Sequence, residues 1–275
     1  MPCSACKSYK SRQESRNIPL VTTRSKHSFL NYPLARSMTT SALQFKNIVK
    51  RHDKKIILNG ITLDIAQGEF FGLIGVNGAG KTTLIKCLLD FCTADEGEID
   101  IFGIHNTLSN ARKPIAFLPE RFAPPYYLTG KDFLKYILEL QNVSYKQSEA
   151  QEVLQTLDLD DSALIRPVRL FSKGMTQKLG LAACFLAQKE LYVLDEPMSG
   201  LDPKARALLK TRLHKLRDKG STLFFSSHAL ADVEEICDRI AILHQGQLRY
   251  IGSPAACCQQ YGTSTLEQAF MRCIE

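Results

Sequence analysis

The sequence predicts an α/β fold with a largely parallel sheet, and three observations lead to that prediction. An apolar run at residues 70–74 indicates a buried strand that enters a glycine-rich loop. The loop opens into a helical pattern with apolar side chains at 84, 85, 88 and 89. Farther along, short apolar strands at 191–194 and 222–226 alternate with a helix at 204–219, which is typical of strand–helix–strand units.

Two further strands are expected before the loop, at 42–49 and 56–65. Residues 117–188 are predicted to be mostly helical, because apolar side chains recur at helical spacing within 131–140 and 149–157. Near the end of the chain, apolar strands at 240–243 and 248–251 flank a turn and predict a hairpin. A short helical pattern follows at 265–270.

The chain divides into three predicted parts. Residues 42–252 form the main domain, and 253–275 form a short C-terminal extension too small for a dedicated regulatory domain. Residues 1–41 are basic and serine-rich with three prolines, so we expect a disordered extension. A transit peptide is the alternative for this segment, although it lacks a sustained amphipathic pattern, and Met38 could be the true start.

Composition narrows the class of protein. The 275-residue chain is 44% hydrophobic, yet no apolar run approaches the ~18 residues of a membrane-spanning helix. Residues 1–42 carry seven basic side chains against one acid, so they hold +6 of the net charge of +7. A nearly neutral main domain argues against nucleic acid as a partner. The nine scattered cysteines fit a reducing cytosol better than a disulfide framework, and Cys3 and Cys6 have no second pair at metal-site spacing.

The loop at 75–82 is the most informative segment, because it matches the phosphate-binding pattern G-x-x-x-x-G-K-[ST] between a strand and a helix. Glycines let the backbone wrap closely around phosphates, and the amides at the helix N-terminus favour negative charge. Lys81 is expected to reach the β- and γ-phosphates, and Thr82 to bind Mg²⁺ through its hydroxyl.

Three later segments extend this chemistry. Asp195 and Glu196 end a buried strand, where ligands bind in such sheets, so Asp195 is expected to hold Mg²⁺ and Glu196 to activate water. Ser172 and Gly174 precede an apolar helix and predict a second phosphate-binding helix terminus. His228 follows the strand at 222–226 and is placed to sense the γ-phosphate.

In this order the segments closely resemble the nucleotide-binding subunit of an ATP-binding cassette (ABC) transporter, over about residues 42–252. The resemblance implies a P-loop NTPase fold with a RecA-like core, an N-terminal antiparallel β subdomain and a helical signature subdomain at about 117–188. It also implies a subunit that hydrolyses ATP with Mg²⁺ to power a separate transmembrane permease.

The resemblance assigns roles to individual residues. The catalytic residues are Lys81, Glu196 and His228, and the Mg²⁺ ligands are Thr82, Asp195 and Glu120, which stands where the family usually has the Q-loop glutamine. The nucleotide would be held by the following residues: Gly75, Asn77, Gly78, Ala79, Gly80, Lys81, Thr82 and Thr83 of the Walker A segment, His52 at the adenine-stacking position, and Ser172 and Gly174 of the signature, presented to ATP on a second copy.

Departures from the pattern refine the expectation. Lys173 replaces the first glycine of the signature, Met175 its glutamine and Glu120 the Q-loop glutamine, which resembles the branch that serves separate exporter-type permeases. The expected partners are a permease and a second ATPase subunit, identical or not. The expected location is cytoplasmic and peripheral, on the cytoplasmic face of the inner or plasma membrane.

Three rival functions remain. A soluble ABC-type ATPase of translation or assembly usually carries two cassettes, whereas one is present here. A DNA-repair ATPase of the superfamily needs a long coiled-coil insertion, and no sustained heptads occur. A GTP-binding switch leaves the segments at 172–178 and 227–228 without a role.

Overall fold

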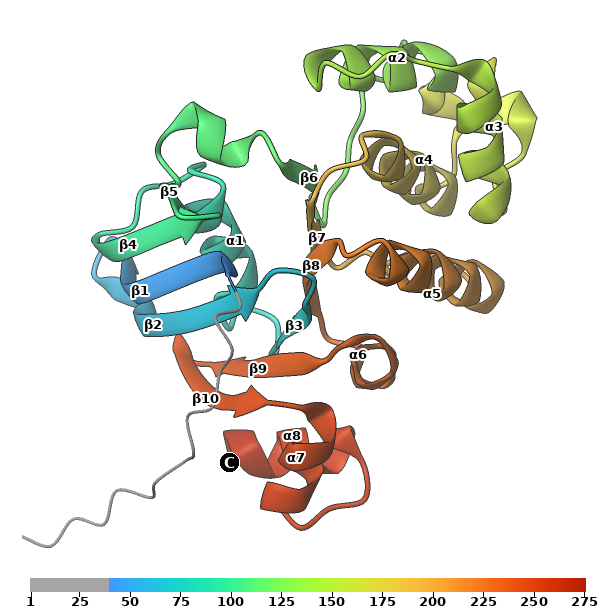
Figure 1. The fold of residues 1–275 in the computed structure, drawn as a ribbon. Helices are drawn as coiled ribbons and strands as arrows, with labels where there is room; N and C mark the ends of the chain where they lie inside the picture. Colours follow the sequence, from blue (N-terminus) through green and yellow to red (C-terminus); the bar gives the residue numbers. More distant parts are fainter. Residues whose placement is uncertain (1–39) are drawn as a thin grey trace, which may run out of the picture. The chain divides into compact units, whose positions relative to one another are not determined.

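A computed structural model describes residues 40–275 and shows a mixed α/β fold with two sheets (Figure 1). The six-stranded sheet has the order β10-β9-β3-β8-β7-β6, and every neighbouring pair in it is parallel except β10 with β9. The four-stranded antiparallel sheet has the order β2-β1-β4-β5. The predicted fold class is therefore confirmed, with its parallel core sheet and antiparallel N-terminal part.

The elements have the following bounds. The strands are β1 Ser41–His52, β2 Lys55–Ala66, β3 Phe70–Ile74, β4 Glu96–Ile101, β5 Ile104–His105, β6 Ile115–Leu118, β7 Leu191–Asp195, β8 Thr222–Ser227, β9 Arg239–His244 and β10 Gln247–Gly252. The α-helices are α1 Lys81–Leu88, α2 Gly130–Leu140, α3 Gln147–Thr156, α4 Lys173–Leu186, α5 Pro203–Asp218, α6 Leu230–Ile236, α7 Pro254–Gln260 and α8 Leu266–Ile274, with short 3-10 turns at Ser109–Arg112, Asp161–Leu164 and Val168–Leu170.

Aromatic side chains pack the two sheets together. The Phe224 ring of β8 lies 6.1 Å from that of Phe45 in β1 and 6.2 Å from that of Phe71 in β3, measured between centroids. All three side chains are fully buried. They belong to a core that also includes the apolar face of α1, which fixes the helix leaving the loop against both sheets.

Helices α2, α3 and α4 form a lobe beside the parallel sheet (Figure 1). Their N-termini are set by local chemistry, since the Thr129 hydroxyl accepts a hydrogen bond from the Asp132 amide and the Ser172 hydroxyl accepts one from the Met175 amide at 3.2 Å. The range predicted to be mostly helical, 117–188, begins inside strand β6, which pairs with β7 at the edge of the sheet.

The structure describes the predicted C-terminal extension fully but only the last residues of the predicted N-terminal extension. Of the expected disordered segment at 1–41, residues 1–39 lie outside the described part, and Ser41 already begins β1. The C-terminal extension forms two helices, and Leu266 and Ala269 of α8 are fully buried in the same core as β9 and α6. Within residues 40–275, no helix has the length and apolarity needed to span a membrane.

Candidate active site

The register of three parallel strands brings the predicted site residues to one edge of the sheet. Ile74 at the end of β3 pairs with Ser227, and Asp195 at the end of β7 pairs with Ser226. The carboxyl ends of β3, β7 and β8 therefore meet where the glycine-rich loop begins. This is the edge at which open α/β sheets bind ligands.

Two glycines of the loop are required by backbone geometry. Gly75 lies so close to β9 that a Cβ atom there would be 2.4 Å from the carbonyl oxygen of Leu243. Gly80 has φ +112°, and a Cβ atom there would approach the Leu58 side chain to 2.9 Å. The loop is consequently pressed against β2 and β9, and α1 begins directly after it at Lys81. Its N-terminal amides are oriented for an anion.

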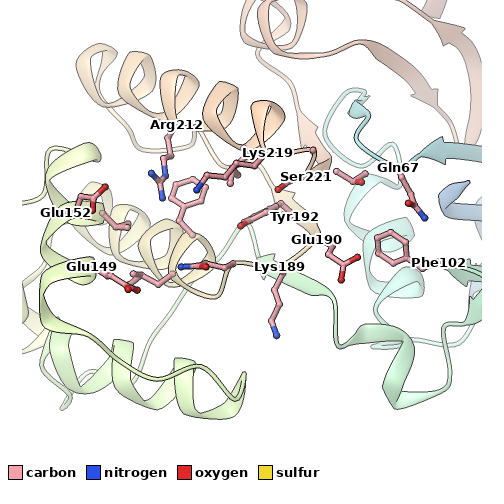
Figure 2. Close-up of a pocket in the computed structure, with 17 residues that line it drawn as sticks. Gln67, Phe102, Glu149, Glu152, Lys189, Glu190, Tyr192, Arg212, Lys219 and Ser221 are labelled. Carbon is pink, nitrogen blue, oxygen red and sulfur yellow. The ribbon is translucent and has the colours of Figure 1, made fainter. Parts of the chain in front are cut away.

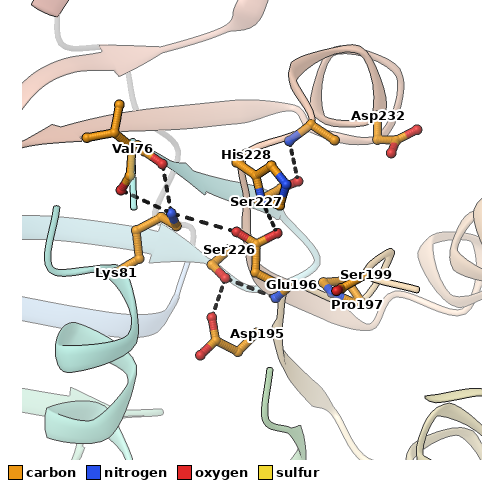
Figure 3. Close-up of polar contacts among 12 residues, drawn as sticks. Val76, Lys81, Asp195, Glu196, Pro197, Ser199, Ser226, Ser227, His228 and Asp232 are labelled. Carbon is orange, nitrogen blue, oxygen red and sulfur yellow. Dashed lines mark hydrogen bonds and ion pairs between the residues drawn. The ribbon is translucent and has the colours of Figure 1, made fainter. Parts of the chain in front are cut away.

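Lys81 is a buried cation, with 7% of its surface exposed. Its ammonium group donates a hydrogen bond of 2.7 Å to the carbonyl of Gly75 and lies 3.7 Å from Oε1 of Glu196. Figure 3 shows the side chain reaching between the Val76 backbone and that carboxylate. A buried ammonium group beside the loop amides favours an anionic ligand.

Asp195 is 1% exposed, and two hydroxyl groups donate hydrogen bonds to it. Thr82 Oγ1 donates to Oδ2 at 3.0 Å, and Ser226 Oγ donates to Oδ1. Burial raises the pKa of Asp195 above its ordinary value; the two hydroxyls oppose the rise, while the charges of Glu120 and Glu196 add to it.

Glu196 is held from three directions. Its amide donates to Ser226 Oγ at 3.0 Å, and its carboxylate lies between Lys81 and His228, whose Nδ1 is 2.8 Å from Oε2. Its backbone adopts φ +51°, a left-handed conformation that is uncommon for a residue with a side chain. His228 itself is 64% exposed at the side chain, so it borders both the carboxylate and solvent.

One pocket of about 640 Å³ contains most of the predicted site. Its lining consists of Lys55, Ile57, Val76, Asn77, Gly78, Ala79, Gly80, Lys81, Thr82, Thr83, Glu120, Arg121, Glu196, Ser199 and His228. Sequence patterns did not assign a role in the site to Lys55, Ile57 or Arg121, or to Ser226 beneath the pocket. Contacts across the fold bring Lys55, Ile57 and Ser226 to the site, whereas Arg121 is the neighbour of Glu120 in the chain.

The residues present fit a magnesium ion. The Thr82 hydroxyl and the Asp195 carboxylate are hard oxygen donors in direct contact, and Asp195, Glu196 and Glu120 leave excess negative charge beside them. In residues 40–275 there is no cluster of three or more His, Cys, Asp or Glu side chains that could hold a metal. A site with few protein ligands suits Mg²⁺, which keeps several waters and binds phosphate oxygens.

Three predicted nucleotide contacts lie elsewhere. Ser172 and Gly174, at the start of α4, do not line the pocket that contains Lys81. His52 lies at the turn between β1 and β2, with 82% of its side chain exposed and Asp53 as its neighbour at 3.2 Å. The adjacent residues Lys55 and Ile57 reach the pocket instead.

A separate pocket of about 480 Å³ lies at the amino ends of β7 and β8, between α3 and α5 (Figure 2). Its rim carries both signs of charge, with Glu149 and Glu152 on α3 facing Arg212 on α5. None of the predicted site residues lies there.

The fold and this edge define a nucleotide-binding α/β protein, and comparison with known proteins gives its family. The ABC transporter family model matches residues 58–199. An uncharacterized ABC transporter ATP-binding protein of Synechocystis sp. is 41% identical over 202 residues, which are 72% of this chain and 57% of that protein. The linearmycin resistance ATP-binding protein LnrL of Bacillus subtilis is 33% identical, over 82% of this chain and 74% of that protein.

A solved structure described as the ATP-binding subunit of an ABC transporter is also similar. The two structures superpose with a TM-score of 0.78 at 30% sequence identity. The matched region covers 84% of this chain and 99% of the solved chain. The chain belongs to the ABC transporter family, among its ATP-binding subunits. It spans 57% of the length of the Synechocystis relative.

Proposed function

We propose that this chain binds and hydrolyses ATP and thereby drives a separate transmembrane permease that acts in export. The observation that supports the proposal most directly is one pocket that joins the phosphate loop, the buried Lys81 and the paired Glu196 and His228. Asp195, the remaining proposed Mg²⁺ ligand, contacts this pocket's lining through its hydrogen bond with Thr82.

The loop residues Gly75, Asn77, Gly78, Ala79, Gly80, Thr82 and Thr83 are proposed to hold the phosphates through backbone amides and hydroxyl groups. Lys81 now donates to the Gly75 carbonyl and would transfer its hydrogen bonds to phosphate oxygens. Thr82, Asp195 and Glu120 would hold Mg²⁺, which supplies charge neutralisation at the phosphates when it is bound.

Glu196 is proposed to orient the attacking water and accept its proton. Its carboxylate is buried between Lys81 and His228, so its direction is fixed before substrate binds. His228 is proposed to hold that direction and to contact the γ-phosphate. Positioning of this kind is the main protein contribution to phosphoryl transfer.

The remaining nucleotide contacts are proposed to come from two other places. Ser172 and Gly174 would bind ATP held by a second copy or a related subunit, because they lie outside the pocket of their own Lys81. His52 is proposed to contact the base from the β1–β2 turn, beside Lys55 and Ile57.

The permease is proposed to dock on the helical lobe near Glu120. Tyr126 and Tyr127 are 68% and 69% exposed and pack edge to face, which leaves an aromatic surface beside Pro124 and Pro125. Export is favoured because the relative LnrL is named for resistance to linearmycin. The subunit is then placed at the cytoplasmic face of the inner or plasma membrane.

The test is purification of the full chain from gently solubilised native membranes, followed by mass spectrometry and by ATPase measurement. A stoichiometric polytopic membrane protein and Mg²⁺-dependent ATP turnover are expected. The Lys81→Ala variant should lose turnover and nucleotide binding. Recovery with ribosomes or assembly factors from the soluble fraction would favour a soluble ABC-type ATPase instead.

A further inference from the structure

The segment that follows Glu196 is fixed to the first turns of α4 by a buried amide. Gln177 is 4% exposed, and its Nε2 donates a hydrogen bond of 3.2 Å to the carbonyl oxygen of Pro197. Pro197 directly follows Glu196, so this bond restrains the peptide next to a residue in the left-handed conformation. A backbone held in such a conformation persists only where its surroundings determine it.

Two more contacts join residues 196–200 to α4; Pro197 and Ser199 of this turn are labelled in Figure 3. In the first contact, the Lys173 ammonium lies 3.4 Å from the Ser199 hydroxyl. Ser199 is itself held in the turn, because its amide donates a hydrogen bond of 3.0 Å to the carbonyl of Glu196. Gly174 packs so closely on the turn that a Cβ atom there would be 2.9 Å from the carbonyl oxygen of Gly200. The start of α4 and residues 196–200 therefore behave as one packed unit.

We infer that Gln177 is a positioning residue for Glu196. Through the Pro197 carbonyl it holds the catalytic carboxylate in place and joins that carboxylate to the N-terminus of α4. The inference rests on the proposed ATP hydrolysis and adds to it, because Ser172 and Gly174 are proposed to contact the nucleotide of a second subunit. Loss of the γ-phosphate from the second subunit's nucleotide would then shift Glu196 in this subunit. The two nucleotide sites of the dimer would be coupled in this way.

The experiment compares Gln177→Met, which keeps the size of the side chain and removes the donor, with Gln151→Met. Gln151 is the matched control, since its Nε2 donates a bond of 2.9 Å to Asp161 in the same lobe, away from Glu196. For Gln177→Met we expect kcat to fall about tenfold, with KM for ATP and Tm close to those of Gln151→Met. An unchanged kcat, or an equal loss in both variants, overturns the inference.

A second variant separates the donor from mere packing. Gln177→Glu keeps the shape, and its carboxyl can donate to the Pro197 carbonyl only when protonated. Its kcat relative to the parent should therefore rise as pH falls, whereas that of Gln177→Met should stay flat. Glu120, Arg121 and Lys173 line a pocket with Gln177, so kcat of each variant is compared with that of the parent at the same pH.

Hydrogen exchange tests the contact without reference to activity. The amides of Ser199 and Leu201 bond within the turn, to the carbonyls of Glu196 and Met198. Faster exchange at 196–201 in Gln177→Met, and not in Gln151→Met, is expected. Unchanged exchange overturns the inference even if the chain proves to have no ATPase activity, whereas lost turnover in the parent would count only against the proposed function.

Discussion

Asp195 illustrates, at the scale of one residue, how a functional group can cost stability. Its carboxylate is buried beside Glu120 and Glu196, and burial is the main reason that its pKa is raised. For an acid with a raised folded pKa, the stabilising contribution is complete below the unfolded value of about 3.9. That contribution is lost as pH rises through the folded pKa. Ionised Asp195 therefore lowers the free energy of unfolding of the apoprotein near neutral pH.

Asp195→Asn should therefore melt at a higher temperature than the parent near neutral pH, and the difference should shrink toward pH 4. Thermal unfolding without nucleotide or Mg²⁺ over a pH series measures it. Asp218→Asn, at an exposed position at the end of α5, is the control and should show no such trend. A difference that grows as pH falls would contradict burial as the cause.

Glu196→Gln addresses the water-activating role. The amide side chain preserves shape and can still contact Lys81 or His228, but it cannot accept a proton from water. We expect ATP binding to persist, turnover to fall at least about 100-fold, and an ATP-dependent dimer to accumulate on gel filtration. Glu190→Gln, at the other end of β7, should behave as the parent. Turnover of Glu196→Gln at the parental rate would remove Glu196 from the mechanism.

Residues with fixed motif spacing could be predicted from the sequence, and those that act through tertiary contacts could not. Lys81 and Thr82 follow from a local pattern, because loop and helix are adjacent in the chain. Ser226 supports both Asp195 and Glu196 from 30 or 31 residues away, through the pairing of β7 with β8. A serine at the end of an apolar strand carries no local signal for that role.

At the scale of elements, long apolar patterns were informative and short ones were not. The strands at β1 and β2 were expected, yet β4 and β5, which complete the same sheet, were missed. Strand β6 has only four residues, and a run of that length does not distinguish strand from helix by periodicity. Its pairing with β7, more than 70 residues later, provides the hydrogen bonds that define it.

Gly97 in β4 gives a test at this scale. A Cβ atom there would lie 2.4 Å from the carbonyl oxygen of Lys46, at the place where the register of β1 and β4 shifts, and its φ is +89°. Gly97→Ala should lower the free energy of unfolding by about 2–3 kcal/mol, from strain and collision together. Denaturant titration at equilibrium measures the change.

Gly103 is the matched control for that variant. It has φ +76° at the turn between β4 and β5, and no atom lies within 4 Å of its Cβ position. Gly103→Ala should lower the free energy of unfolding by about 1 kcal/mol, because only the conformational strain contributes. Equal losses in the two variants would show that the close approach of Gly97 to β1 contributes nothing.

For the whole molecule, the central feature is that the two segments predicted to bind phosphate, the glycine-rich loop and the start of α4, lie at two adjoining pockets. The phosphate loop and Glu196 share one pocket, whereas Phe171 and Lys173 line another that has only Glu120, Arg121 and Ser199 in common with it. The spacing of residues along the chain predicted both segments, but it could not show that they line different pockets. A complete site, on the proposed mechanism, needs two subunits.

Mixing two inactive variants tests that arrangement. Lys81→Ala removes the phosphate loop's cation, and Ser172→Asp keeps a residue that caps α4 while placing a carboxylate against the incoming phosphate. Each variant alone should have little turnover. In a mixed dimer, the intact loop of the Ser172→Asp chain faces the intact signature of the Lys81→Ala chain. Random pairing makes about half of the dimers mixed, so about a quarter of the sites should regain activity.

The dependence on mixing ratio gives the decisive measurement. Recovered turnover should be greatest at equal amounts of the two chains and should vanish at either extreme, since only mixed dimers contain a complete site. A double variant carrying both changes is the control and should restore nothing when mixed with either single variant. If no ratio restores turnover although gel filtration shows mixed dimers, Ser172 acts within its own chain.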